Sequence, residues 1–290
     1  MGKLARLSAA TVISVLFGLV AALPAQAGDE NQDSLYLATG DSVPFGFSPL
    51  LSRSSATNFV GYPDVVAKAL DLDLTNSSCP GEASGGFTSL TGTDNVCRPY
   101  RAYFPLHVGY STSQLDFVAN FLKSHRRTRL VTITIGANDL FVLEKSCPPM
   151  TDPGFVTCVE AGLPSLLAAL GANLEVIYSK IRSVYHHDLV ALTYYALNYA
   201  DPVGVQVIGL INAVIGAHTL AWRGKVADGF AAFQKASAHF GGSTCAAGLR
   251  IVLVPQPAPP ADPCDVHPTA KGRNLLARAV LRAVGEGGDH

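Results

Sequence analysis

The stretch Leu35-Tyr-Leu-Ala-Thr-Gly-Asp-Ser-Val-Pro-Phe-Gly46 determines how the rest of the chain is interpreted. Its apolar run, residues 35–38, ends abruptly at Thr39-Gly40-Asp41-Ser42. An apolar run that stops at a tight polar turn is typical of a buried parallel strand. In α/β proteins the ligand site lies at the carboxyl ends of such strands. Ser42 is therefore a candidate nucleophile at that edge of the predicted sheet.

Further strand-like segments alternate with helical patterns along the chain. After the first strand, strands are expected at residues 72–75, 130–135, 189–194 and 251–254. Helical patterns separate them, including one over residues 217–240 before the last strand. Alternating strands and helices predict a parallel sheet with helices on both faces. We therefore expect an α/β fold, a three-layer α/β/α sandwich around a parallel five-stranded sheet.

The first residues have the pattern of a secretory signal peptide. Lys3 and Arg6 precede an apolar run at residues 9–23, and Ala25-Gln26-Ala27 has the small-x-small form of a cleavage site. The apolar run is shorter than the roughly 20 residues that cross a bilayer. We therefore favour a signal peptide at residues 1–27 over a membrane anchor. Residues 28–290 are expected to form a single secreted domain, periplasmic or extracellular, with no integral membrane segment after cleavage.

The charge of the chain disfavours a nucleic-acid partner. Loss of Lys3 and Arg6 with the signal peptide changes the formal net charge from −1 to −3. A protein that binds nucleic acid usually carries a basic patch or stripe, and this near-neutral chain has no basic block. We expect a monomer with no nucleic-acid partner.

The six cysteines favour disulfides over a metal site. An even number of cysteines behind a secretory signal indicates disulfide bonds. The sequence contains no CxxC and no HxxxH pattern, so we expect no metal. Six cysteines allow 15 connectivities, and proximity in the sequence favours one of them. Its pairs are Cys79–Cys97, Cys147–Cys158 and Cys245–Cys264.

Four polar segments that follow strand-like runs supply what a serine nucleophile needs. A serine hydroxyl requires a base to take its proton, and histidine has a suitable pKa. His267 lies after the last expected strand and before the final helical pattern. Acyl transfer also requires donors for the negative charge that develops on oxygen. The main-chain N–H groups of Ser42 and Gly81 and the side-chain amide of Asn138 are the candidates.

These residues resemble the four blocks of the SGNH/GDSL hydrolase superfamily. The blocks are Gly40-Asp41-Ser42, Gly81, Gly136-Ala-Asn138-Asp139 and His267-Pro268, in that order. The chain is similar in particular to secreted bacterial lipases and esterases of this group that carry three sequential disulfides. The resemblance implies a flavodoxin-like fold and ester hydrolysis without a cofactor. It also implies that Ser42 is the nucleophile, that His267 is the base, and that Ser42, Gly81 and Asn138 form the oxyanion hole.

One position departs from the family pattern. The family often places Asp three residues before the histidine, where this chain has Cys264. The acid here is Asp265, two residues before His267. Some relatives instead orient the histidine with a main-chain carbonyl. Asp265 and a carbonyl around residues 264–265 are therefore rival candidates for that role.

The expected function is that of a secreted serine esterase or lipase, with an acyl-enzyme on Ser42 and a small-molecule or lipid ester as substrate. A thioesterase or carbohydrate acetylesterase would use the same machinery with another pocket. An α/β-hydrolase would need G-x-S-x-G, and Pro44 stands where the second glycine should be. A non-catalytic ester- or glycan-binding protein should have lost one of the four block residues, and none is lost.

Tyr194 ends the strand expected at residues 189–194, and Tyr195 and Asn198 lie just beyond it. They therefore lie at the same edge of the sheet as the candidate site. Side chains at that edge either line the ligand pocket or pack against the core. The sequence alone leaves both interpretations open.

Overall fold

The centre of the structure is a parallel sheet of five strands in the order β2-β1-β3-β4-β5. The computed structural model describes residue 2 and residues 34–253 and 262–285, so nearly all of the expected signal peptide lies outside the described residues. The strands are β1 (Leu35–Gly40), β2 (Asp73–Asn76), β3 (Thr128–Thr134), β4 (Asp188–Leu192) and β5 (Lys225–Ala227). The α/β class and the parallel five-stranded sheet are confirmed.

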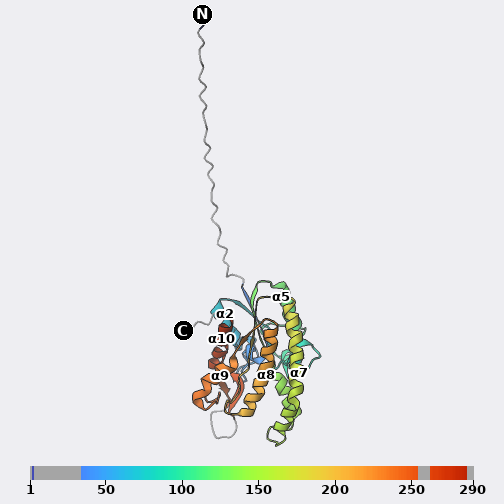
Figure 1. Ribbon diagram of the computed structural model, residues 1–290, viewed down its shortest axis with the longest axis vertical. Helices are drawn as coiled ribbons and strands as arrows, with labels where there is room; N and C mark the ends of the chain where they lie inside the picture. Colours follow the sequence, from blue (N-terminus) through green and yellow to red (C-terminus); the bar gives the residue numbers. More distant parts are fainter. Residues whose placement is uncertain (1, 3–33, 254–261, 286–290) are drawn as a thin grey trace. The chain divides into compact units, whose positions relative to one another are not determined.

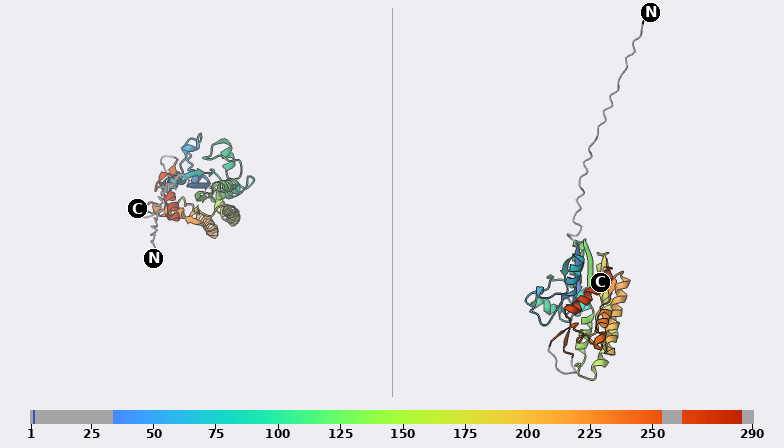
Figure 2. Two further views of the ribbon diagram at one scale, coloured as in Figure 1. Left: turned by 90° about the horizontal axis from the view of Figure 1, so that it is seen from above. Right: turned by 90° about the vertical axis from the view of Figure 1, so that its left-hand side faces the viewer.

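Helices cover both faces of this sheet (Figure 1). One layer contains α2 (Tyr62–Leu70), α9 (Gly229–Ser237) and α10 (Ala270–Val284), and α10 packs against both of the others. The other layer contains α5 (Gln114–Ser124), α7 (Phe155–Arg182) and α8 (Pro202–Ala221). Figure 2 shows α7 and α8 side by side. The remaining α-helices are α1 (Ser42–Phe45), α3 (Ser84–Thr88), α4 (Cys97–Tyr103) and α6 (Ala137–Ser146).

The prediction of the fifth strand was wrong. The edge of the sheet is β5, inside the segment predicted to be helical at residues 217–240. There α8 ends at Ala221 and α9 begins at Gly229. The expected strand at residues 251–254 lies instead in β6 (Arg250–Val252), which pairs antiparallel with β7 (Cys264–Pro268) in a separate ribbon. Three residues are too few to show a strand periodicity, so the sequence pattern missed β5.

The turn after β1 depends on Gly40. This residue has φ +128°, a conformation that residues with a side chain rarely adopt, and a Cβ there would lie 2.0 Å from the carbonyl oxygen of Thr134. The close approach lets the Asp41 N–H donate to the same oxygen at 3.0 Å. Strands β1 and β3 therefore end side by side, and Ser42 begins α1 directly above them.

The three expected disulfides are present. Each joins one cysteine to the next cysteine along the chain, with Cα–Cα distances of 5.6, 5.7 and 5.8 Å. They are Cys79–Cys97, Cys147–Cys158 and Cys245–Cys264. The last bridge anchors the start of β7, the strand that carries His267.

By length and composition, α7 and α8 each could cross a bilayer. Both also contribute to the core, since Leu170 and Leu174 of α7 and Ile211 and Ile215 of α8 are buried. Core helices of globular proteins pass the same test, so their apolar composition is weak evidence for a membrane span.

Candidate active site

The structure brings Ser42 and His267 together from opposite ends of the chain. Asp41 caps α1 by accepting from the Val43 N–H, which fixes the turn that carries Ser42. Strand β7 places the His267 side chain beside this turn, with Nε2 2.8 Å from Ser42 Oγ. This distance is that of a hydrogen bond.

Asp265 holds the other side of the histidine ring. Its carboxylate accepts from His267 Nδ1 and, at 3.0 Å, from the His267 main-chain N–H. A proton on Nδ1 leaves Nε2 free to accept from the Ser42 hydroxyl. Partial burial opposes ionisation of Asp265, but hydrogen bonds and charge attraction from His267 hold its pKa below the ordinary value.

The rival acceptors for the histidine, the main-chain carbonyls of Cys264 and Asp265, contact a different side chain. Both face Nη1 of the buried Arg250, at 3.5 and 3.4 Å. The carboxylate of Asp265 is thus the acceptor that the structure places on His267 Nδ1.

Asn138 contacts the same turn, and Gly81 lies two residues beyond Cys79, whose N–H donates to the Gly40 carbonyl at 2.9 Å. Gly81 has φ +83°, and a Cβ on it would lie 2.1 Å from a methyl carbon of Val96. Asn138 is in the first turn of α6, and its Nδ2 donates to Asp41 at 3.5 Å. Its Oδ1 accepts from Asn95 Nδ2 at 2.8 Å. These two contacts fix the orientation of the amide, because the reversed amide would set its oxygen against the Asp41 carboxylate.

A mainly apolar cavity of about 620 Å³ opens beside Ser42 and His267. Its walls come from α6, α7 and α8 and include Leu140, Phe141, Phe155, Val159, Val207 and Ile208. Among the described residues, the lining contains the acids Asp41, Glu144, Glu160, Asp201 and Asp262 and no Lys or Arg. The lining therefore suits an apolar group and carries no cation to hold an anionic one.

Comparison with known proteins agrees with this geometry. A model of the GDSL-like lipase/acylhydrolase family matches residues 38–275. The chain belongs to this family. It is therefore a GDSL-type ester hydrolase. None of the curated protein sequences is similar enough to the chain to count as a match.

Several solved structures share the fold of this GDSL hydrolase. The phospholipase A1 of Streptomyces albidoflavus superposes with a TM-score of 0.57 at 20% identity, covering 88% of this chain and 100% of its own. The acetylxylan esterase Axe2 of Geobacillus stearothermophilus gives 0.52 at 19% identity, covering 87% and 95%. A protein of Parabacteroides merdae described as GDSL-like gives 0.51 at 16% identity, covering 88% and 96%.

Asp41 does more in this GDSL hydrolase than shape a turn. It is buried, and burial raises its pKa to about 6. Its carboxylate accepts from the Tyr194 hydroxyl and from the Val43 N–H at 2.9 Å. Asp41 also accepts from Asn138. This one carboxylate therefore contacts both the turn that carries Ser42 and the side-chain amide at the start of α6.

No sequence pattern indicated Glu82 and Gln114, which are hydrogen-bonded to each other and reach the same turn through Gly40. Gln114 Oε1 accepts from the Gly40 N–H at 2.6 Å, and its Nε2 donates to the Gly40 carbonyl at 3.1 Å and to Glu82 Oε2 at 3.0 Å. Glu82 follows Gly81 and is 2% exposed. Burial, with repulsion from Asp94, raises its pKa to about 8. A glutamate in a glycine-rich segment gives no sequence signal of burial.

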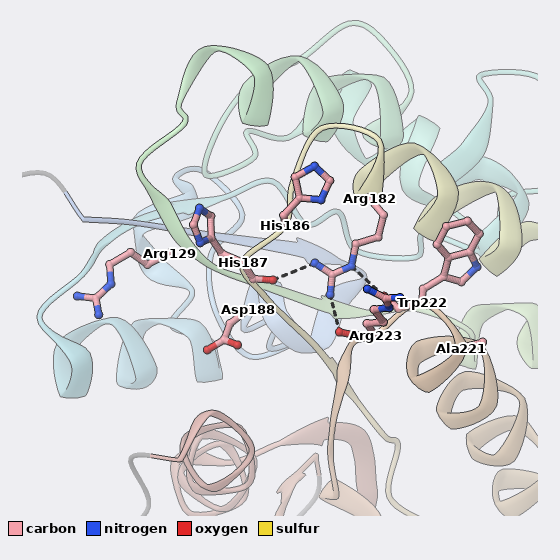
Figure 3. A pocket seen from close by; sticks show the side chains of 8 residues that line it. All are labelled: Arg129, Arg182, His186, His187, Asp188, Ala221, Trp222 and Arg223. Atoms are coloured by element: carbon pink, nitrogen blue, oxygen red, sulfur yellow. Dashed lines mark hydrogen bonds between the residues drawn. The ribbon is translucent and has the colours of Figure 1, made fainter.

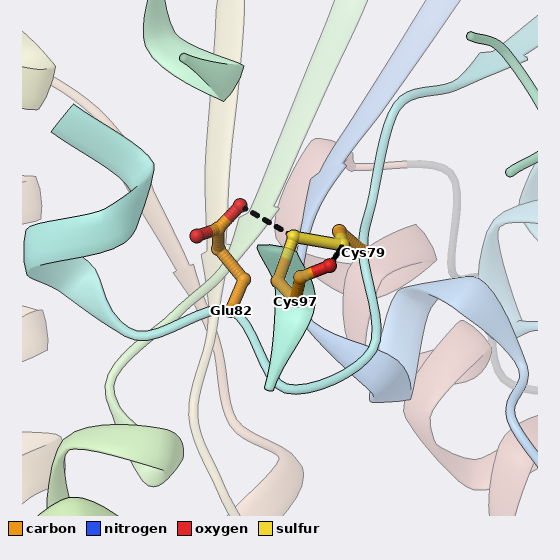
Figure 4. A group of neighbouring side chains, drawn as sticks. All are labelled: Cys79, Glu82 and Cys97. Atoms are coloured by element: carbon orange, nitrogen blue, oxygen red, sulfur yellow. Dashed lines mark hydrogen bonds between the residues drawn. A yellow bond between two sulfur atoms is a disulfide. The ribbon is translucent and has the colours of Figure 1, made fainter. Parts of the chain in front are cut away.

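Glu82 also contacts the disulfide that closes this loop (Figure 4). Its Oε2 lies 3.2 Å from the Sγ atom of Cys97. A disulfide sulfur carries no hydrogen, so Cys97 does not donate in this contact. Glu82, Cys79 and Cys97 lie as close together as metal ligands do, but neither sulfur is available as a thiolate.

A second cavity, of about 850 Å³, lies at the amino ends of β3 and β4 (Figure 3). Its most central cation, Arg182, donates to the main-chain carbonyls of Trp222, His187 and Arg223 at 2.9, 2.9 and 2.8 Å. These bonds tie the loops before β4 and β5 together. Arg182 therefore has a structural role here, and none of the predicted site residues lines this cavity.

Proposed function

We propose that this GDSL hydrolase is a secreted serine esterase or lipase that cleaves carboxylic esters through an acyl-enzyme on Ser42. The observation that carries the proposal is the 2.8 Å contact between His267 Nε2 and Ser42 Oγ, with Asp265 on the opposite ring nitrogen. A serine, its base and an acid that orients the base are the minimum for nucleophilic catalysis at neutral pH.

In this mechanism Ser42 Oγ attacks the ester carbonyl carbon while its proton moves to His267 Nε2. The N–H groups of Ser42 and Gly81 and the Nδ2 amide of Asn138 donate to the oxyanion of the tetrahedral intermediate. His267 then protonates the departing alcohol, which leaves the acyl group on Ser42. Water, deprotonated by His267, attacks that acyl group and releases the acid. Asp265 stays ionised and stabilises the imidazolium.

The apolar cavity supports an acyl or lipid ester as the substrate. A volume of about 620 Å³ holds far more than an acetyl group. Side chains of α6, α7 and α8 would enclose an acyl chain, and the lack of a cation suits an uncharged tail. One protein of similar structure is a phospholipase A1, and another is an acetylxylan esterase. The cavity favours the first kind of substrate over the second.

A chain-length series of p-nitrophenyl esters tests both the mechanism and the substrate class. We expect kcat/KM of residues 28–290 to rise from acetate to a medium or long acyl chain. Ser42→Ala should abolish hydrolysis, whereas Ser54→Ala, at an exposed position, should leave the rate unchanged. An unchanged rate in Ser42→Ala refutes the mechanism. A rate that is highest for acetate favours the acetylesterase alternative.

The proposal that the enzyme is secreted rests on the N-terminal pattern and on the three disulfides. Disulfides of this kind persist in oxidising compartments. Expression of the full chain in a secreting bacterial host should give an exported protein whose sequence begins at Gly28. Retention of residues 1–27 on membrane-bound protein would instead support the anchor interpretation.

A further inference from the structure

Two consecutive tyrosines follow β4 and reach the two halves of the catalytic site. We propose that Tyr194 and Tyr195 are positioning residues for the reaction. Tyr194 fixes the turn that carries Ser42, and Tyr195 fixes the strand that carries His267. This inference rests on the proposed function, because it assumes that Ser42 and His267 are the reacting pair.

Tyr194 acts through Asp41. Its hydroxyl donates to Asp41 Oδ2, the same oxygen that accepts from Asn138. A buried carboxylate is stable only when donors surround it, so the Tyr194 hydroxyl sets where the Asp41 carboxylate lies. That carboxylate in turn accepts from the Val43 N–H at the start of α1 and from the side-chain amide of Asn138, a proposed oxyanion donor.

The position of Tyr194 is itself determined by α8. The side chain of Asn212 accepts from the Tyr194 main-chain N–H at 2.8 Å and donates to its carbonyl at 2.7 Å. This pair of bonds fixes the main chain just beyond the end of β4. The hydroxyl of Tyr194 therefore reaches Asp41 from a fixed base.

Tyr195 acts through Val266. Its hydroxyl donates to the Val266 carbonyl at 2.6 Å, one residue before His267. Its ring stacks on Phe233 of α9, with centroids 4.0 Å apart and planes 12° apart. Strand β7 pairs with β6 and not with the main sheet. Tyr195 lies just beyond β4 of the main sheet, so its hydroxyl links that sheet directly to the strand that carries His267.

Neither hydroxyl bonds the side chains of Ser42 or His267 among the described contacts, so the two tyrosines act through neighbours. Burial raises the pKa of both tyrosines well above the ordinary value, which keeps the two hydroxyls protonated as donors. A misplacement of reacting groups by about 1 Å costs on the order of 100-fold in rate. Loss of either hydroxyl should therefore reduce turnover.

The test replaces each tyrosine by phenylalanine, which keeps the ring and removes the hydroxyl. Tyr185→Phe is the matched control, because the buried Tyr185 also donates to a main-chain carbonyl, that of Asp188, at the opposite end of β4. Hydrolysis of the best p-nitrophenyl ester is measured together with Tm. Assays at a temperature far below every Tm ensure that a less stable variant is still folded.

Tyr194→Phe and Tyr195→Phe should each lower kcat about 10-fold with KM changed less than twofold. The two effects should multiply in the double variant, because the hydroxyls hold separate parts of the site. Tyr185→Phe should lower Tm comparably and leave kcat unchanged. Unchanged kcat in the two variants, or an equal loss in Tyr185→Phe, overturns the inference. If one of these results occurs while Ser42→Ala is inactive in the same assay, the positioning role is refuted and the proposed function still holds.

Discussion

Replacing Glu82 by glutamine should change how the stability of the protein depends on pH. Glu82 is 2% exposed, and its Oε2 accepts from Gln114 Nε2 at 3.0 Å. Burial raises the pKa of this carboxyl from its ordinary value of 4.5 to about 8. At neutral pH the folded protein therefore keeps a proton on Glu82 that the unfolded chain has released. Glu82→Gln replaces that neutral acid by a neutral amide of nearly the same shape.

The sign and size of the effect follow from linkage between proton binding and folding. The stabilisation from a raised carboxyl pKa is fully present below about pH 4.5 and is lost as the pH rises to about 8. Between these values the wild-type free energy of unfolding falls by about 1.4 kcal/mol per pH unit relative to the variant. Over this whole pH range the wild type loses on the order of 5 kcal/mol of unfolding free energy relative to the variant.

Urea unfolding of the disulfide-intact protein at one-unit steps from pH 4 to pH 9 measures this difference. Subtracting the wild-type free energy of unfolding from that of Glu82→Gln should give a line that rises through pH 8 and then flattens. The control Glu160→Gln, at an exposed position, should give a flat line. Parallel pH profiles for the wild type and Glu82→Gln would refute the argument that Glu82 is protonated in the folded state.

Two substitutions and a thiol titration test the site and its supports. Asp265→Asn should lower kcat by about 10²- to 10⁴-fold, because the amide no longer holds the required tautomer of His267; a near-wild-type rate in the p-nitrophenyl ester assay would return the orienting role to a main-chain carbonyl. Gly81→Ala should lower kcat by at least about 100-fold, since a Cβ would lie 2.1 Å from Val96 and displace an oxyanion donor, whereas Gly109→Ala, with open space around it, should not. Thiol titration in denaturant should detect no thiols before reduction and six afterwards, and any thiol in the unreduced protein would contradict a disulfide.

The strong strands and the polar residues that follow them were predictable from the sequence. The run that became β1 is apolar and ends at Gly40-Asp41-Ser42, and the β-branched run that became β3 is followed by Gly136-Ala137-Asn138. Two long-range consequences followed from that pattern. The sheet is parallel, and the segments carrying Ser42 and Asn138 meet at one edge.

The rest depended on tertiary contacts that leave no local signal. Strand β5 has three residues beside a long apolar helix, so its pairing with β4 decides its conformation. His267 was placed after the last strand of the sheet, but it lies within a separate ribbon. The roles of Glu82 and Tyr194 depend on partners 32 and 153 residues away in the sequence.

Helix α8 separates the apolar cavity beside Ser42 from the only tryptophan in the sequence. Val203, near the start of α8, lines the cavity, and Trp222 follows the last residue of the helix. A helix of 20 residues is about 30 Å long. The indole N–H donates to Glu175 at 2.9 Å, on the side of the molecule where Arg182 holds the loops. Tryptophan fluorescence thus reports on that distant end of α8, and we expect a ligand in the cavity to leave the tryptophan signal unchanged.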